Sequence, residues 1–410
     1  MADKTPVDMT EKLDKQEVDD KVAAARAEAA AAFMSDEDAT PIDAVHEVGE
    51  VVLSVRHLTK RFPVKKGLLG KAAEYVHAVN DISFDVHRGE TFAIVGESGC
   101  GKSTTGKCIL RLIEPTEGDV TLDGIDFTSL KGEELTQARQ KIKLIFQDPY
   151  SSLNPRMTVQ DIIAEPIDIV KTYKTRAERN ARVEQVMEMV GLDLSYKNRY
   201  PHEFSGGQRQ RVGIARALAL EPKLIVCDEP VSALDVSIQA QVLNLLDDLK
   251  EQLGLTYLFI AHGLNVVKHI SDRVGVMYLG RMMEIAPKES LYTEPLCPYT
   301  QALLSAIPSP DPKLQRRRII LEGDVPSPID PPAGCRFASR CFAKVGACDV
   351  SAPEQREVLP DHMCACHRYE TVPTERARAL SLEIQHDAAR PSYGRGSDLI
   401  NDDPVVTPDA

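Results

Sequence analysis

The sequence predicts an α/β fold with a helical insertion and a small cysteine-rich module near its C-terminal end. Three observations predict it. Short apolar runs alternate with helical stretches between residues 51 and 261, a glycine-rich loop joins one such run to a helix, and prolines and cysteines become frequent after residue 287. Strands that alternate with helices are typical of a sheet covered by helices. We therefore expect an α/β domain over residues 49–286, with its helical insertion near residues 150–205.

Each expected element is a run with the period or the composition of a strand or a helix. The expected strands are residues 51–55, 81–86, 91–95, 143–146, 224–227 and 257–261. The expected helices begin at residue 102 and cover residues 159–190 and 238–253. None of the apolar runs approaches the roughly 20 residues that a membrane-spanning helix needs. Residues 287–370 follow as a separate, loop-rich module that contains the cysteine cluster.

The two ends of the chain differ from the part between them. Residues 1–48 are rich in Ala, Asp, Glu and Lys, and we interpret them either as a disordered or loosely helical arm or as a helix that binds a partner. Residues 371–410 are polar and are expected to be disordered. The N-terminus has neither a basic start nor an apolar stretch, so we expect no secretory signal.

The net charge of −13 comes mainly from these ends. Residues 1–50 hold 14 acidic and 5 basic side chains, and residues 371–410 hold 7 and 4, which leaves a charge of about −1 for residues 51–370. A general nucleic-acid binder would need basic patches to displace counterions from phosphates. We therefore expect no nucleic acid among the partners, and neither a secreted nor an integral membrane protein.

The glycine-rich loop is the strongest motif. It follows the apolar run 91–95, opens a helix and matches G-x-x-x-x-G-K-[ST], a pattern that binds phosphate in this context. Its glycines let backbone N–H groups face the β- and γ-phosphates, and the helix N-terminus adds positive potential. We expect Lys102 to contact the phosphates and the Ser103 hydroxyl to bind Mg²⁺. The expected nucleotide-binding residues are Gly96, Glu97, Ser98, Gly99, Cys100, Gly101, Lys102, Ser103 and Thr104.

An acidic pair, Asp228 and Glu229, follows the apolar run 224–227. Asp228 would end a buried strand, where its carboxylate can hold Mg²⁺. Glu229 can then orient or deprotonate the attacking water as the catalytic base. The alternative is a solvated turn. Within the loop itself, Cys100 is either a small residue at a tolerant position or a reactive thiol whose pKa the helix N-terminus lowers.

Residues 204–208 read Phe-Ser-Gly-Gly-Gln, which resembles the signature of ATP-binding cassette (ABC) proteins. The resemblance implies a P-loop NTPase fold with a RecA-like α/β core, an antiparallel β subdomain and a helical signature subdomain. In the family the signature loop faces the phosphate loop of another subunit, and two ATP molecules lie between the subunits. A single copy of each motif implies half of such a dimer. The signature residues expected to bind nucleotide are Ser205, Gly206, Gly207 and Gln208.

Other positions resemble further elements of the cassette. Gln147 matches the Q-loop glutamine, which contacts Mg²⁺ and the transmembrane partner, and Asp235 matches the D-loop. His262 matches the catalytic switch histidine near the γ-phosphate, although a glycine follows it where the family usually has Asp. Phe62 is the expected aromatic partner of adenine, and Tyr75 is a second candidate.

The resemblance is closest to the dipeptide/oligopeptide import ATPases of the DppF/OppF type, and it covers residues 51–370. The segments that carry it are residues 62–70, 96–101, 147–155, 229–237, 298–303 and 331–335. It implies an ATPase on the cytoplasmic face of the bacterial inner membrane. Its partners would be a second, different ATPase, two permeases and, indirectly, a periplasmic peptide-binding protein. Nickel or glutathione import, export, and a soluble ABC ATPase of translation or DNA repair are alternatives.

The chain has nine cysteines, and five of them lie between residues 335 and 366. Their spacing matches neither the common zinc patterns nor the ferredoxin patterns, and disulfides are not expected without an export signal. In the peptide-importer ATPases this segment binds a [4Fe–4S] cluster. The resemblance implies Cys335, Cys341, Cys348 and Cys366 as its ligands and leaves Cys364 spare. Structural zinc and free thiols are alternatives.

Overall fold

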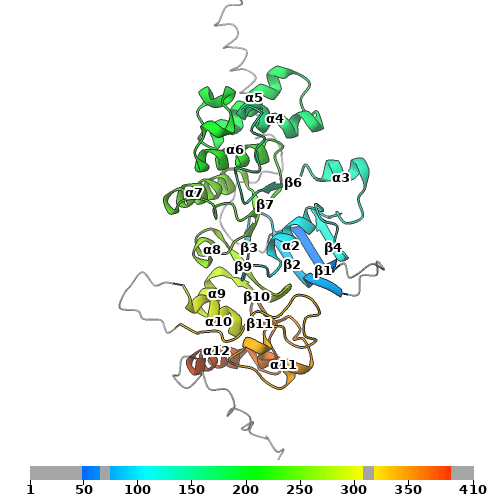
Figure 1. The fold of residues 1–410 in the computed structure, drawn as a ribbon, viewed down its shortest axis with the longest axis vertical. Helices are drawn as coiled ribbons and strands as arrows, with labels where there is room; N and C mark the ends of the chain where they lie inside the picture. The colour runs from blue at the N-terminus through cyan, green and yellow to red at the C-terminus, as the bar shows by residue number, and fades with distance from the viewer. Residues whose placement is uncertain (1–48, 65–73, 308–317, 389–410) are drawn as a thin grey trace, which may run out of the picture.

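The computed structural model describes residues 49–64, 74–307 and 318–388, which form two β-sheets surrounded by helices (Figure 1). The larger sheet has eight strands in the order β11-β12-β10-β9-β3-β8-β7-β6. Its strands are β3 (Thr91–Val95), β6 (Ile142–Ile145), β7 (Leu224–Asp228), β8 (Thr256–Ile260), β9 (Arg273–Tyr278), β10 (Arg281–Pro287), β11 (Arg356–Leu359) and β12 (His362–Cys364).

The centre of the larger sheet is parallel. Strands β6, β7, β8, β3 and β9 pair in parallel, and β3, β7 and β8 are buried along their whole length. Such burial on both faces is why these strands are continuous apolar runs in the sequence. The helices that accompany this sheet are α2 (Lys102–Ile109), α7 (Val236–Leu253), α8 (Leu264–Ile270), α9 (Lys288–Thr293) and α10 (Pro298–Ser305).

The smaller sheet is antiparallel and matches the antiparallel β subdomain that the resemblance implies. Its strands are β1 (Val51–Val64), β2 (Glu74–His87), β4 (Glu117–Leu122) and β5 (Ile125–Asp126), and α3 (Gly132–Ala138) follows it. Its apolar face packs with α2 and one face of β3 in a single hydrophobic cluster, to which Val55, Phe84 and Ile94 belong. This packing holds the β1–β2 ribbon against the last turn of α2, at Cys108 and Ile109.

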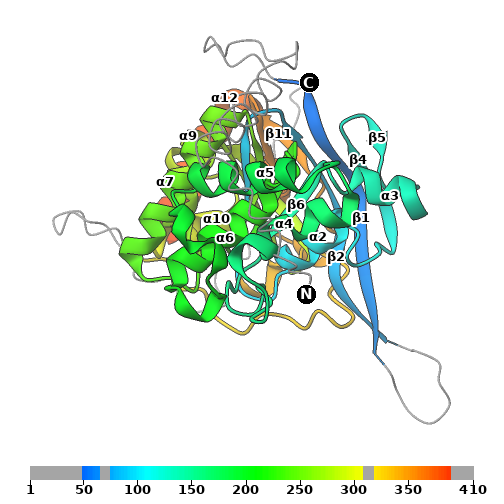
Figure 2. The ribbon, with the colours of Figure 1, turned by 90° about the horizontal axis from the view of Figure 1, so that it is seen from above.

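A helical insertion forms one end of the molecule, and Figure 2 shows it in front of the sheets. Each of its helices begins at a hydroxyl side chain that accepts a hydrogen bond from an N–H group of the first turn, a contact that stabilises helix starts. The helices are α4 (Val159–Val170), α5 (Arg176–Met189) and α6 (Gly206–Leu218), and the capping residues are Thr158, Thr175 and Ser205.

The region expected as a separate module, residues 287–370, shares the larger sheet with the α/β domain. Strand β12 pairs with β10, so the larger sheet continues directly into residues 356–364. Phe337 and Tyr369 belong to the same buried cluster as the central strands. The sequence analysis did not include this pairing, because strands of three and four residues are too short to give a sequence signal.

The expectation that residues 371–410 are disordered is wrong for its first part. Helix α12 (Thr374–Ala388) docks on the C-terminal region, with Ala377, Ser381 and Ile384 buried at helical spacing. Buried Gln301 of α10 donates to the Ser381 backbone oxygen at 3.2 Å and to its hydroxyl at 3.0 Å. The sequence pattern did not predict this helix, because its buried face includes the small Ala377 and the polar Ser381.

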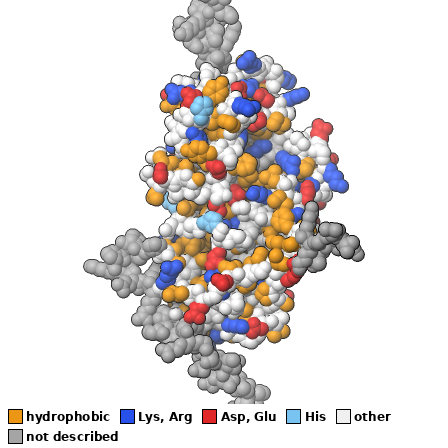
Figure 3. Space-filling model, in the orientation of Figure 1, with side chains coloured by type: hydrophobic (Ala, Val, Ile, Leu, Met, Phe, Trp, Pro, Cys, Tyr) orange, Lys and Arg blue, Asp and Glu red, His pale blue; other side chains and the backbone are white. Residues whose placement is uncertain are grey.

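The expectations for residues 1–48 and 389–410 lie outside the described residues. Within the part of the chain that the structure describes, every helix is too short or too polar to cross a membrane. Positive and negative side chains are interspersed over the face in Figure 3, which agrees with the nearly neutral charge of residues 51–370.

Candidate active site

Four loops meet at the carboxyl edge of the parallel strands. The glycine-rich loop follows β3, Gln147 follows β6, Glu229 follows β7 and His262 follows β8. Because the strands are parallel and adjacent, their carboxyl ends lie on one edge of the sheet, where α/β folds bind ligands. The topology alone therefore brings together residues from positions 96 to 262.

Backbone geometry explains the glycines of the phosphate loop. Gly96, Gly99 and Gly101 have φ angles of 153°, 77° and 108°, in the region that side chains with a Cβ avoid. A Cβ on Gly96 would lie 2.0 Å from the Met277 backbone oxygen, and one on Gly101 would lie 2.1 Å from that of Ala78. Gly96 and Gly101 therefore exclude any residue with a Cβ, whereas Gly99 is favoured only by its φ angle. The loop then opens α2 at Lys102, as expected.

Lys102 lies inside the loop that it follows. Its side chain is buried, and its ammonium donates to the backbone oxygens of Gly96 at 2.8 Å and Glu97 at 3.0 Å. Next to it, Ser103 and Thr104 are half-buried on the first turn of α2, and Ser98 and Gly99 are exposed at the tip of the loop. The ammonium is thus fixed beside the backbone N–H groups that can bind phosphate.

The phosphate loop and the acidic pair are in direct contact. The Ser103 hydroxyl donates to Asp228 Oδ1 at 2.7 Å, although the two residues are 125 positions apart. Asp228 ends β7 and is 7% exposed. A hydroxyl and a carboxylate held this close are oxygen donors of the kind that Mg²⁺ prefers, so these residues fit the ion.

Glu229 is held between two predicted partners. Gln147 Nε2 donates to Glu229 Oε2 at 2.6 Å, and His262 Nε2 lies 2.6 Å from Glu229 Oε1. Glu229 is 5% exposed and has a φ of 50°, which is strained for a side chain other than glycine. Its N–H donates to the Ile260 backbone oxygen at 2.9 Å, which fixes the strained turn. The solvated-turn interpretation of the acidic pair is therefore wrong.

Cys100 has the properties of a small buried residue. It is 4% exposed, and burial raises the pKa of its thiol, against the opposing effect of Lys102. The reactive-thiol hypothesis needs an exposed thiol with a lowered pKa, and Cys100 has neither property.

The adenine candidates lie on the β1–β2 ribbon. Phe62 pairs with Val76, two residues before Ala78, whose backbone oxygen touches the phosphate loop. The Lys60 ammonium lies 5.0 Å from the centre of the Phe62 ring. Tyr75 is 42% exposed and belongs to strand β2, where it pairs with Pro63. The strand partner of Phe62, Val76, is therefore two residues from Ala78, which contacts the phosphate loop at Gly101.

The signature residues and the D-loop form a second exposed surface. Ser205 and Gln208 form a capping box at the start of α6, and Ser205 is exposed. A Cβ on Gly207 would lie 2.6 Å from the Ile238 side chain of α7, and one on Gly206 would lie 3.2 Å from Leu234. Asp235 is exposed as the N-cap of α7, and its side chain makes no cap hydrogen bond.

The glycine after the switch histidine starts a helix. Gly263 is the N-cap of α8 and provides no side-chain cap. Aspartate at this position could accept from the first turn, but the difference between Asp and Gly as N-caps amounts to only a few tenths of a kcal/mol. His262 keeps its contact with Glu229 in the absence of that carboxylate.

The expected iron–sulfur ligands gather in one region but do not converge. Burial raises the pKa of Cys335 to about 12, and its neighbours Cys297 and Cys348 add to the shift. Burial likewise raises the pKa values of Cys341 and Cys366. Nevertheless, among the described residues no three Cys, His, Asp or Glu side chains are placed to hold a metal ion. The structure does not support the predicted four-cysteine ligand set.

Comparison with protein families identifies the arrangement. Residues 79–232 match the family model for ABC transporters, and residues 283–348 match that for the C-terminal region of oligopeptide/dipeptide transporters. The oligopeptide transport ATP-binding protein AppF of Bacillus subtilis is 53% identical over 323 residues, which cover 78% of this chain and 98% of AppF. The chain belongs to the ABC transporter ATP-binding proteins of the oligopeptide group.

Other relatives agree with this family. The oligopeptide transport ATP-binding protein OppF of Bacillus subtilis is 56% identical over 271 residues, which cover 66% of this chain and 87% of OppF. As a member of this ABC family, the protein is an ATPase.

Solved ABC cassettes share the fold. The dimeric post-hydrolysis state of the cassette MJ0796, bound to ADP and Pi, is 32% identical, with a TM-score of 0.51 over 58% of this chain and 98% of that one. The ABC protein cbiO1 of Clostridium perfringens, part of the cbiONQ transporter complex, is 27% identical, also with a TM-score of 0.51, over 60% and 91% of the two chains.

Proposed function

We propose that this ABC protein is the ATP-hydrolysing subunit of an importer that takes up di- or oligopeptides. The observation that carries the proposal is Glu229, whose carboxylate lies 2.6 Å from both Gln147 and His262, one residue from the Asp228–Ser103 contact. A carboxylate held in a fixed orientation next to the predicted Mg²⁺ ligand Asp228 is placed where it can position or deprotonate a water molecule. Relatives named as oligopeptide transport proteins support the peptide class.

Each residue has a distinct proposed role in hydrolysis. Lys102 and the N–H groups of the phosphate loop bind the phosphates and offset their charge. Glu229 orients the attacking water, and His262 fixes Glu229 and contacts the γ-phosphate side of the site. Gln147 connects this centre to the exposed loop that begins at Phe146, which is 43% exposed. A change at the nucleotide site on ATP binding or hydrolysis can therefore move this loop and the partner bound to it.

Ser103, Asp228 and Gln147 would hold Mg²⁺. The ion would neutralise charge on the phosphates and orient them. Hydrogen bonds hold these side chains in place. Ser103 donates to Asp228, and Gln147 donates to the neighbouring Glu229.

We propose that two ATPase subunits form the working unit. Ser205 at the N-terminus of α6 is exposed, so this helix end would contact ATP on a neighbouring phosphate loop. The dimeric cassette among the solved relatives supports this arrangement. The proposed partners are a second homologous ATPase and two permeases at the cytoplasmic face of the membrane, with a periplasmic peptide-binding protein that delivers the substrate.

The experiment is the substitution Glu229→Gln, which keeps the size of the side chain and removes its basicity. ATP binding should be unchanged, and steady-state hydrolysis by the assembled transporter should fall by about 10²–10⁴-fold, the usual contribution of a general base. Peptide uptake into proteoliposomes should be lost in parallel. A variant that keeps most of its turnover would assign the base to another residue.

A [4Fe–4S] cluster on Cys335, Cys341, Cys348 and Cys366 is a separate proposal that rests on the resemblance alone. No step of the mechanism above depends on it. Iron and acid-labile sulfide in anaerobically purified protein would support the cluster, and zinc in place of both would support a structural zinc site. Protein without iron, sulfide or zinc would show that these cysteines are free thiols.

A further inference from the structure

The C-terminal region contacts the phosphate loop through an ion pair at Glu97. One guanidinium nitrogen of Arg340 lies 3.1 and 2.9 Å from the two carboxylate oxygens of Glu97, and it also donates to the Tyr278 hydroxyl at 3.3 Å. The Arg340 side chain is 10% exposed. Burial lowers the pKa of Arg340, but the hydrogen bonds to Glu97 and Tyr278 outweigh burial and raise it. The Glu97 side chain is 27% exposed, so the ion pair is partly buried and less screened by solvent than a fully exposed one.

A second contact holds the backbone of the same residue. The Glu97 N–H donates to the Tyr299 hydroxyl of α10 at 3.0 Å. Tyr299 packs against Tyr278 of β9 and against Phe337, with ring centres 4.7 and 5.3 Å away. All three rings are buried. The C-terminal region thus provides a rigid aromatic support for Glu97.

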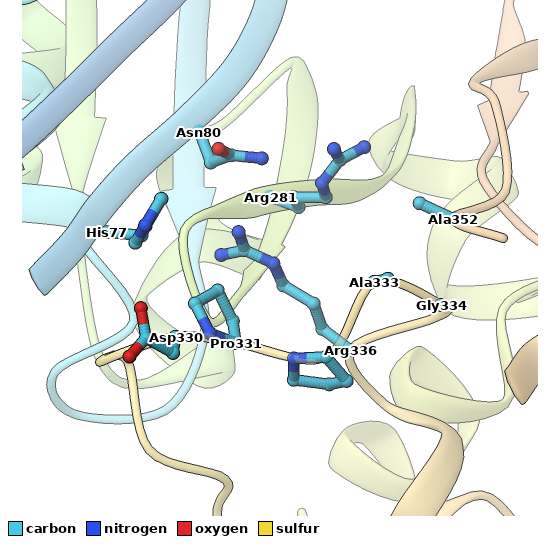
Figure 4. Close-up of a pocket in the computed structure, with 10 residues that line it drawn as sticks. His77, Asn80, Arg281, Asp330, Pro331, Ala333, Gly334, Arg336 and Ala352 are labelled. Carbon is cyan, nitrogen blue, oxygen red and sulfur yellow. The ribbon is translucent and has the colours of Figure 1, made fainter. Parts of the chain in front are cut away.

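A third contact holds the phosphate loop at Cys100. The Gly280 N–H donates to the Cys100 backbone oxygen at 2.8 Å, and the Gly280 oxygen accepts from the Asn80 N–H at 2.8 Å. Arg336 donates to the neighbouring backbone oxygen, that of Leu279. Figure 4 shows the Arg336 side chain extending toward Asn80 and Arg281 across a cavity of about 360 Å³. Arg340 therefore contacts the phosphate loop directly, whereas Arg336 supports the neighbouring turn at Leu279 and Gly280, which in turn contacts Cys100.

These contacts end at the residue that binds phosphate. The Glu97 backbone oxygen accepts from the Lys102 ammonium at 3.0 Å, so the position of Glu97 sets the position of Lys102. A loop with three glycines at positive φ has many conformations, and fixing one of them lowers the entropy cost of binding. We propose that residues 335–341 clamp the phosphate loop and that Arg340 is a positioning residue for ATP. This inference depends on the proposed role of Lys102.

Two substitutions break the pair from opposite sides. Arg340→Gln should raise the Kd for Mg-ATP of the full-length chain about 5- to 30-fold, as expected for a partly buried ion pair, with kcat at saturating ATP changed less than about 2-fold. Glu97→Gln should have a similar effect, because it removes the same ion pair from the side of the phosphate loop. The double variant should be no worse than either single one, because both remove the same contact. Arg340→Lys, which keeps the charge, should recover part of the affinity.

A matched control and a reference variant separate the possible outcomes. Arg378 is a C-terminal arginine whose ion pair with Glu294 is exposed, so Arg378→Gln should leave the Kd unchanged. Equal Kd values for Arg340→Gln and Arg378→Gln would overturn the clamp, as would additive effects of Arg340→Gln and Glu97→Gln. Lys102→Ala tests the phosphate site itself, and normal ATP binding by this variant would overturn the proposed site. If Lys102→Ala loses ATP binding but Arg340→Gln does not, the phosphate site stands and only the clamp is refuted.

Discussion

At the scale of single residues, the contacts that matter most join positions far apart in the sequence. Ser103 meets Asp228, and Glu229 meets Gln147 and His262, at distances of 2.6–2.7 Å. The motifs named every one of these residues, because phosphate chemistry restricts which side chains can serve. No motif named Arg340 or Tyr299 as part of the site. Their role depends on how the C-terminal region folds back on the loop, and nothing in their local sequence encodes that.

Asp123 allows a residue-scale prediction about pH. Its carboxylate lies 3.0 Å from Lys141, 3.2 Å from Lys223 and 3.3 Å from Arg88. Burial raises the pKa of Asp123, but the hydrogen bonds and charges of the two lysines outweigh burial and lower it to about 2. Because the folded pKa lies below the unfolded value of about 3.9, this stabilisation is present above pH ~4 and is lost as the pH falls toward 2.

Asp123→Asn tests this stabilisation. Asparagine tolerates the positive φ of 51° at this position, so the substitution removes charge and leaves the turn intact. We expect it to lower the free energy of unfolding by about 1 kcal/mol at pH 7, after allowance for screening at the partly exposed lysines. Urea unfolding should show the difference shrinking below pH ~4. A difference that does not change with pH would exclude the charge network as its cause.

At the scale of elements, the buried central strands were predictable and the C-terminal elements were not. Residues 91–95 were expected as a strand and form β3, because a continuous apolar run has few alternatives in an α/β fold. The expected helix 159–190 is interrupted between α4 and α5, where Lys171 adopts a φ of 59°. Helix α12 was missed because Ala377 and Ser381 are buried without being strongly hydrophobic.

Helix α12 provides an element-scale prediction with an internal control. Ile384 is 5% exposed and Leu382 is 64% exposed on the same helix. Ile384→Ala should lower the free energy of unfolding by about 2 kcal/mol, the lower end of the range for a buried aliphatic side chain, because it lies near the helix end. Leu382→Ala should change it by less than about 0.5 kcal/mol. Equal effects in urea unfolding would mean that α12 does not dock.

At the scale of the whole molecule, the phosphate loop and the signature residues proposed to bind a neighbour's ATP open two different helices. The phosphate loop opens α2 at the edge of the sheet, and the signature residues open α6 in the helical insertion. Complete sites therefore need a second subunit in the proposed dimer. This division could be inferred from the resemblance, whereas the docking of the C-terminal region onto the cassette could not, since it depends on strands of three and four residues.

The substitution Ser205→Arg tests the division at this scale. It should leave the Kd for ATP of the isolated chain unchanged, because Ser205 lies outside this chain's own phosphate site. It should cost about 1 kcal/mol of stability through the lost cap and slow hydrolysis by the assembled transporter at least about 100-fold. Weakened ATP binding by the isolated variant, measured by titration, would place the signature in the site of its own chain.

The pairing of β10 with β12 also has a consequence for how the protein is synthesised. Glu284 and Ile285 in β10 pair with Cys364 and Met363, and fully buried Glu284 lies 2.6 Å from equally buried His362. A ribosome that adds 5–20 residues per second needs roughly 4–16 s to travel from one strand to the other. Throughout that interval the nascent chain carries an open strand edge and a carboxylate without its histidine, and unpaired edges invite association with other chains. Residues 356–364 therefore cover the β10 edge, so premature termination before residue 362 would release a cassette in which that edge is unpaired.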